Sequence, residues 1–242
     1  YPEVVARRAA RRPAWFGSYL TTILQRDIRD LANVEGLTAL PRLLELLAAR
    51  AATLVRFSEV SRSAGIPQTT LKRYMALFET TYLTREIRPW SANVSKRLVK
   101  TPKRMFVDTG LLGSLAGWTE RRMAETLDLA GALLENFVTM ELQKQAGWSR
   151  AKVRQFHFRT ASGREVDLVL ENEAGRLVGI EVKASASVRA ADFRGLETLR
   201  EVARERFYRG VVLYAGREAL PFGKRLHAIP ISALWRLGAS SK

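Results

Sequence analysis

The chain has 242 residues, of which 40 are Lys or Arg and 24 are Asp or Glu, giving a formal net charge of +16. It contains no cysteine, which excludes disulfide scaffolds, thiol nucleophiles and metal sites built on thiolates. Its two histidines are too few for a histidine-based metal centre. A metal site would therefore be built from carboxylates, which favours Mg²⁺ or Mn²⁺.

The apolar residues are distributed as in a packed globular protein. They make up 47% of the chain, and no apolar run approaches the roughly 18–20 residues that span a bilayer. We expect a soluble, cytoplasmic protein with no membrane partner, and the opening Tyr1-Pro2-Glu3 favours a piece of a longer protein. The positive charge is compatible with binding to nucleic acid, with binding to an anionic surface and with simple compositional bias. The sequence leaves the oligomeric state open and does not exclude an oligomer.

Helices are predicted along the first quarter of the chain. Residues 3–12 form a short arginine-rich helix that Pro13 should end. Residues 14–33 carry apolar side chains at helical spacing and predict a core-facing helix, and residues 38–52 predict another.

The stretch from Ser58 to Tyr74 has the spacing of a helix-turn-helix. Ser58 is predicted to cap a short helix, Gly65 to take a positive φ at the turn, Ile66 to fill the angle, and Pro67 to lie in the first turn of the second helix. The start of that second helix presents the polar side chains that reach bases and phosphates in a major groove: Gln68, Thr69, Lys72 and Arg73.

Two short strands predicted at residues 82–89 and 97–108 would close this region as a winged helix. Cations cluster where the wing would meet a nucleic-acid backbone, among them Lys96, Arg97, Lys100, Lys103 and Arg104. Two interpretations stay open. The module binds DNA, or it docks a protein while its cations are merely solvated.

The second half predicts a helix at 127–145, strands at 152–160, 165–171 and 177–184, a helix at 190–206, and strands at 210–215 and 226–231. This order is typical of an α/β sandwich, with parallel pairing after the crossover helix. The fold class is thus α/β, or α+β for the whole chain.

One set of charged residues in this half suggests chemistry. Asp167 lies within an apolar strand, and strand alternation places Glu181 and Lys183 together on one face of the next strand. If the strands are adjacent, two carboxylates could hold one Mg²⁺, and the ammonium could act on a water or a phosphate. Glu135, on the preceding helix, could complete the metal shell. The alternative is a solvated strand face with a turn-capping aspartate.

The order Glu135, Asp167, Glu181-Val182-Lys183 resembles the restriction-endonuclease-like PD-(D/E)xK superfamily, although Val166 stands where the superfamily's proline would be. Nearly the whole chain also resembles the C-terminal region of predicted prokaryotic AAA-type ATPases that carry domain of unknown function 4143. The segments that carry this resemblance are residues 1–4, 19–30, 97–103, 106–111, 131–138, 165–168, 180–185 and 230–232. The resemblance implies an ATPase domain elsewhere in the same longer protein.

The sequence therefore predicts a helical linker at 1–36, a winged-helix domain at 37–118 and a nuclease-like domain at 119–242. The favoured function is DNA binding with Mg²⁺- or Mn²⁺-dependent phosphodiester hydrolysis, in which Asp167, Glu181 and Glu135 hold the metal and Lys183 acts with them. The rival is an inactive DNA- or protein-recognition module that regulates the ATPase. A toxin or defence effector is a biological context for either. No ATP site is predicted, because the chain lacks a glycine-rich phosphate loop.

Overall fold

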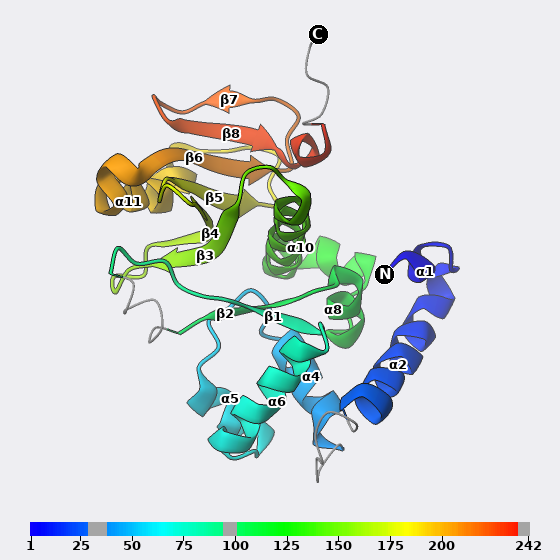
Figure 1. Ribbon diagram of the computed structural model, residues 1–242. Helices are drawn as coiled ribbons and strands as arrows, with labels where there is room; N and C mark the ends of the chain where they lie inside the picture. Colours follow the sequence, from blue (N-terminus) through cyan, green and yellow to red (C-terminus); the bar gives the residue numbers. More distant parts are fainter. Residues whose placement is uncertain (29–37, 94–100, 237–242) are drawn as a thin grey trace. The chain divides into compact units, whose positions relative to one another are not determined.

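The computed structural model describes residues 1–28, 38–93 and 101–236 (Figure 1). Its fold class is α/β, as predicted, and its main sheet is mixed and has six strands, one more than the five predicted. The chain forms two compact units. The first contains Tyr1–Glu86 and Lys103–Thr126, and the second contains Ile87–Pro102 and Leu127–Lys242.

The first unit begins with short helical segments rather than one helix over residues 3–12. They are α1 (Pro2–Val5), the 3₁₀ turn η1 (Ala9–Arg11), α2 (Arg12–Thr22) and the π-helical η2 (Ile23–Ile28). The prediction that Pro13 ends a helix was wrong, because Pro13 lies in the first turn of α2, where its missing N–H costs no hydrogen bond. Residues 29–33 of the predicted second helix lie outside the described residues.

The helix-turn-helix geometry is present. Its helices, preceded by α4 (Ala39–Ala48), are α5 (Phe57–Ala64) and α6 (Gln68–Thr80). Gly65 takes the left-handed conformation at φ 67°, and Ile66 is buried, as predicted. The helix starts differ, since Arg56 rather than Ser58 is the N-cap of α5 and Pro67 immediately precedes α6. The apolar face of α6 is buried through Leu71, Tyr74, Met75 and Phe78.

Two short strands follow, and they pair as a two-stranded sheet. These are β1 (Thr84–Ile87) and β2 (Lys103–Phe106), both shorter than predicted, and the unit ends with α8 (Thr109–Leu115) and α9 (Glu120–Glu125). The segment between the strands, predicted as a wing, belongs to the second unit instead. Its Trp90 is 1% exposed and lies in the core of that unit.

The second unit opens with α10 (Leu127–Trp148) and contains a sheet with the strand order β3-β4-β5-β6-β8-β7. The strands are β3 (Val153–Arg159), β4 (Glu165–Asn172), β5 (Leu177–Lys183), β6 (Phe207–Tyr214), β7 (Leu220–Pro221) and β8 (Leu226–Pro230). Strands β3, β4 and β5 pair antiparallel, and β5, β6 and β8 pair parallel, which confirms the predicted parallel pair after the crossover. The crossover contains η3 (Ala190–Phe193), α11 (Arg194–Ala203) and η4 (Arg204–Arg206).

A helix covers each face of this sheet (Figure 1). Helix α10 packs through Val138 on Leu168, Ile180 and Val182. Helix α11 packs on the other face with Leu196 and other side chains, in the core that also contains Trp90. Because side chains alternate along a strand, the odd-numbered residues of β5 lie on the α11 side.

A buried ion network fixes Trp90 in this core. Its indole N–H donates to Oε1 of Glu171 at 3.3 Å, and the Arg206 guanidinium lies 5.4 Å from the centre of the indole ring. Glu171, 2% exposed, also pairs with Arg206 and with Arg154. Residues 87–93, the part of the segment after β1 that the structure describes, are therefore tied to the second unit through Trp90.

Candidate functional site

The predicted adjacency of the two charged strands is confirmed. In the antiparallel register of β4 and β5, Leu168 lies opposite Ile180, so Asp167 and Glu181 are the next residues along their two strands. Both carboxylates are largely buried, with residue exposures of 7% for Asp167 and 9% for Glu181. Lys183 lies on the same side of β5 as Glu181, as predicted from strand alternation.

Each carboxylate has a donor that offsets the cost of its burial. The backbone N–H of Val182 donates to Oδ2 of Asp167 at 2.9 Å, which ties the Asp167 side chain to the neighbouring strand. The Lys183 ammonium donates to Oε1 of Glu181 at 3.0 Å. Two carboxylates and one ammonium thus lie together on neighbouring strands, and both carboxylates are buried rather than solvated.

The charge of Lys183 follows from this arrangement. Burial acts to lower the pKa of the Lys183 ammonium, but attraction to Glu181, reinforced by Asp167 and Asp192, outweighs it and raises the pKa above its ordinary value. Lys183 is therefore a cation at neutral pH.

Asp192 is a neighbour that the sequence did not reveal. It lies in η3, and its side chain accepts the backbone N–H of Arg189 at 2.8 Å. Its carboxylate contributes to the electrostatic field at Lys183. The only local sign in the sequence is an acidic residue in the first turn of a helix, which indicates capping and says nothing about Lys183.

Glu135 is not brought into a three-ligand cluster. It lies on α10, whose neighbouring residues Leu134 and Val138 pack on the sheet face opposite to that of Glu181. Within residues 1–28, 38–93 and 101–236 there is no group of three His, Cys, Asp or Glu side chains that could hold a metal ion. The acidic pair Asp167 and Glu181 therefore forms the core of the candidate site.

The predicted recognition residues of α6 are all exposed. Gln68, Thr69, Lys72 and Arg73 face solvent at the start of the helix. The turn that precedes them is held by two contacts between Ser61 and Ile66, a backbone hydrogen bond of 3.1 Å and a bond from the Ser61 hydroxyl to the Ile66 carbonyl of 2.6 Å. This surface is available to a partner.

Two of the five cations predicted on the wing are described, and both are buried. Lys96, Arg97 and Lys100 lie outside the described residues, and Lys103 and Arg104 are 2% and 4% exposed. We therefore leave Lys103 and Arg104 out of the candidate nucleic-acid surface, because a buried guanidinium or ammonium cannot reach a phosphate.

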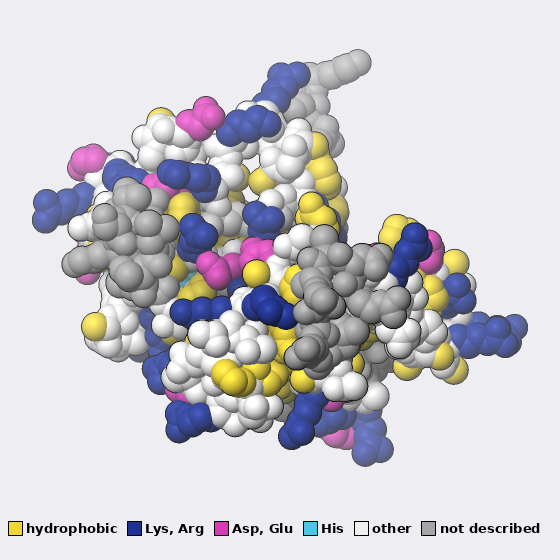
Figure 2. All heavy atoms as spheres, turned by 60° about the horizontal axis from the view of Figure 1, so that its bottom comes forward, with side chains coloured by type: hydrophobic (Ala, Val, Ile, Leu, Met, Phe, Trp, Pro, Cys, Tyr) yellow, Lys and Arg dark blue, Asp and Glu magenta, His cyan; other side chains and the backbone are white. Residues whose placement is uncertain are grey.

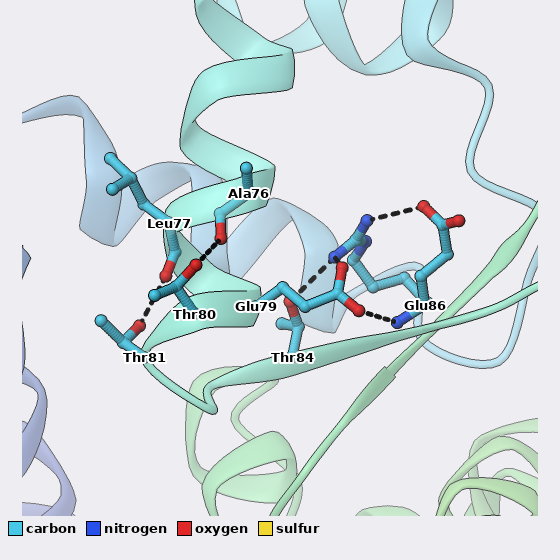
Figure 3. Close-up of polar contacts among 8 residues, drawn as sticks. Ala76, Leu77, Glu79, Thr80, Thr81, Thr84 and Glu86 are labelled. Atoms are coloured by element: carbon cyan, nitrogen blue, oxygen red, sulfur yellow. Dashed lines mark hydrogen bonds and ion pairs between the residues drawn. The ribbon is translucent and has the colours of Figure 1, made fainter.

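Arg104 is buried, and three acceptors from α6 and β1 converge on it. Its guanidinium contacts Glu79 at 3.4 Å, Glu86 at 3.3 Å and the Thr84 hydroxyl at 3.2 Å. Figure 3 shows Glu79, Thr84 and Glu86 turned toward one another where α6 is followed by β1. Arg104 thus joins β2 to β1 and α6 within the first unit.

Comparison with known proteins identifies the family. A family model described as a domain of unknown function (DUF8612) matches residues 1–122, just over half of the 242 residues. The chain belongs to the DUF8612 family. A second model, domain of unknown function DUF4143, matches residues 130–234. The match to DUF4143 therefore covers most of α10 and all six strands of the second unit. The sequence alone had suggested a resemblance over nearly the whole chain.

Two curated relatives extend over both family regions. They are the uncharacterized proteins Rv2008c of Mycobacterium tuberculosis and Mb2031c of Mycobacterium bovis, each 29% identical to this DUF8612 chain over 239 residues. The match covers 98% of this chain and 52% of each relative, so the chain spans about half the length of these relatives. No solved structure matches the chain. Across the part of the chain that the structure describes, no helix is both long and apolar enough to cross a membrane.

Proposed function

We propose that this chain binds nucleic acid and hydrolyses phosphodiester bonds with the help of a divalent metal ion. The observation that carries the proposal is the buried pair Asp167 and Glu181 on neighbouring strands of one sheet, with the partly exposed Lys183 beside them. A pair of carboxylates next to a charged lysine matches the chemistry of phosphate ester cleavage, in which negative charge develops on phosphate oxygens.

The donor set suits Mg²⁺ or Mn²⁺. Asp167 and Glu181 offer only carboxylate oxygens, the ligands that these hard cations prefer, and they would hold the ion. When bound, the ion would supply Lewis acidity and lower the pKa of a coordinated water. Two neighbouring carboxylates repel each other, so a divalent cation between them would also stabilise the fold.

Lys183 would stabilise charge rather than remove a proton. Its raised pKa keeps the ammonium protonated, and one of its three N–H groups is engaged by Glu181. The remaining donors can hydrogen-bond a phosphate oxygen or orient a water. Glu181 would thus have two roles, because it positions Lys183 and carries one of the two ligand groups.

Nucleic-acid binding is assigned to the start of α6. Its exposed side chains Gln68 and Thr69 can contact base edges, and Lys72 and Arg73 can contact phosphates. Figure 2 shows Lys and Arg side chains dispersed over the visible face among apolar and acidic ones rather than gathered in one patch. Net charge alone therefore does not locate the interface, and the proposal rests on α6.

The proposed context is the C-terminal part of an AAA-type ATPase in the prokaryotic cytoplasm. It is supported by the DUF4143 match and by relatives about twice as long as this chain. The ATPase domain of the same longer protein would be the natural partner.

A cleavage assay with Mg²⁺ and Mn²⁺ on single-stranded and duplex DNA and RNA tests the proposal. We expect Asp167→Asn and Glu181→Gln to abolish cleavage and the Mn²⁺-induced rise in melting temperature. Lys183→Met should keep that rise but lose cleavage about 100-fold or more. Glu135→Gln should weaken the response to metal less than Asp167→Asn does.

The matched control is Glu173→Gln, which changes an exposed carboxylate just after β4 and should leave both responses unchanged. If the unmutated chain shows neither cleavage nor metal-induced stabilisation, the catalytic proposal fails.

A non-catalytic recognition module is the second candidate. It is favoured by the ion pair with Lys183 that already engages Glu181. DNA binding without cleavage would support it. The double substitution Lys72→Glu and Arg73→Glu should then weaken DNA binding and reduce the salt slope by roughly one unit per lost phosphate contact. The control pair Arg194→Glu and Arg200→Glu changes two exposed arginines of α11.

A further inference from the structure

An arginine-lined hollow lies near the start of the first unit, and none of its lining residues takes part in the proposed function. Ala6, Arg7, Arg8 and Arg11 line a cavity of about 370 Å³ that is open to solvent. Its volume falls in the range of small-molecule sites, roughly 300–1,000 Å³. The hollow is formed by one short stretch of chain between α1 and α2.

The backbone holds the three arginines around this hollow. The N–H of Arg7 donates to the Val4 carbonyl at 3.0 Å, which closes the end of α1. Arg8 is extended, with φ −56° and ψ 139°, and its carbonyl accepts the N–H of Arg11 at 2.9 Å. The side chain of Arg12 turns back and donates from Nε to the Arg7 carbonyl at 3.2 Å. The turn is thereby fixed at both ends.

Among the described residues, no acidic side chain pairs with the arginines of the hollow. No ion pair within residues 1–28, 38–93 and 101–236 involves Arg7, Arg8 or Arg11. Glu3 is the only acidic residue before Asp27 in the sequence. Arginine stays protonated at all relevant pH values, so three like charges face one cavity, and a multivalent anion would relieve their repulsion.

We propose that this hollow binds an oligophosphate. Guanidinium groups bind phosphate oxygens through paired N–H donors, and three of them match a ligand that concentrates several negative charges in one small volume. A nucleic-acid strand instead spaces its phosphates along a backbone, with one charge for each nucleotide. The concentration of three guanidinium groups around one small hollow therefore favours a compact oligophosphate over a backbone track.

The contacts come from side chains and not from a glycine-rich loop. We therefore expect binding without hydrolysis. The four lining residues provide no aromatic ring on which a base could stack. ATP should accordingly bind no more tightly than inorganic triphosphate, and an ATP affinity more than tenfold tighter would overturn the assignment to phosphate recognition alone.

Calorimetric titration of the whole chain with inorganic triphosphate tests the proposal. We expect one site, with affinity decreasing from triphosphate to pyrophosphate to phosphate. The triple substitution Arg7→Gln, Arg8→Gln and Arg11→Gln should weaken triphosphate binding at least tenfold. Melting curves without ligand show whether the triple variant is folded. The single substitution Arg8→Gln is a milder test, and we expect it to weaken triphosphate binding about threefold or more.

The control is the triple substitution Arg42→Gln, Arg150→Gln and Arg200→Gln, which removes the same charge from exposed arginines elsewhere. Equal loss of triphosphate binding in both triple variants would mean diffuse electrostatic attraction and would overturn the proposal. Loss of DNA binding with unchanged triphosphate binding in the hollow variant would also overturn it, because the arginines would then serve a nucleic-acid backbone.

Discussion

Replacing Trp90 should separate the two interpretations of the segment between β1 and β2. A wing would face nucleic acid, whereas a segment held by the sheet contributes to stability. Trp90 is 1% exposed, donates a hydrogen bond to Glu171 and lies beneath the Arg206 guanidinium. Trp90→Ala should therefore destabilise the second unit without changing any surface that contacts DNA.

The magnitude follows from the buried area. A tryptophan buries roughly 150–250 Å², which at about 25 cal/mol/Å² corresponds to about 4–6 kcal/mol as an upper limit. Tryptophan-to-alanine changes in cores cost about 3–5 kcal/mol. We expect a loss of about 3–5 kcal/mol for Trp90→Ala. Trp90→Phe keeps a ring but loses the bond to Glu171, and should cost about 1–2 kcal/mol.

Urea unfolding followed by far-ultraviolet circular dichroism measures these changes without relying on tryptophan fluorescence. Trp148, 74% exposed at the end of α10, provides a matched control, and Trp148→Ala should cost less than about 0.5 kcal/mol. The reasoning is refuted if Trp90→Ala costs no more than Trp148→Ala. A wing would instead give normal stability with weakened DNA binding.

Three further outcomes follow from individual contacts. Because the pKa of Lys183 is raised in the folded state, its stabilising effect is complete below its ordinary pKa of 10.5 and is lost as pH rises through the higher folded value. The stability difference between the unmutated chain and Lys183→Met, measured by urea unfolding, should be constant from pH 7 to 9 and shrink above about pH 10.5. Arg104→Ala should cost about 1–2 kcal/mol by urea unfolding, because Glu79 and Glu86 stay partly solvated, and Arg104→Met should cost less if packing rather than charge dominates. Gly195→Ala should cost about 3 kcal/mol, since the new Cβ would lie 1.9 Å from the carbonyl oxygen of Glu165, and a cost below 0.5 kcal/mol would show that α11 can shift.

Features that depend on local rules could be predicted from the sequence. Gly65 is one such feature, because glycine is the residue type that most readily takes a positive φ at the end of a helix. Asp167 and Glu181 lie in consecutive antiparallel strands joined by a short turn, so the period-two pattern and the short connection were enough to place them together.

Features that depend on distant partners could not be predicted. Trp90 and Glu171 are 81 positions apart, and no periodicity links them. Arg104 belongs to a run of cations that looks solvated, but carboxylates from α6 and β1 converge on it only in the folded unit. Pro13 illustrates a third reason, because a proline can follow the end of one helix or lie in the first turn of the next. Which of the two occurs depends on whether the residues before it or those after it pack as a helix.

The division of the chain into units restricts how the candidate site can be separated from the rest of the protein. The polypeptide passes from one unit to the other after Glu86, after Pro102 and after Thr126. A fragment beginning at the predicted boundary of residue 119 would contain Asp167, Glu181 and all six strands but would lack Trp90 and therefore part of the core on the α11 face. Since Glu181 and Lys183 lie on that same face, loss of this packing would disturb the site whose chemistry the fragment was meant to retain. The proposed chemistry of the acidic pair should therefore be measured in the whole chain, in which Trp90 completes this core.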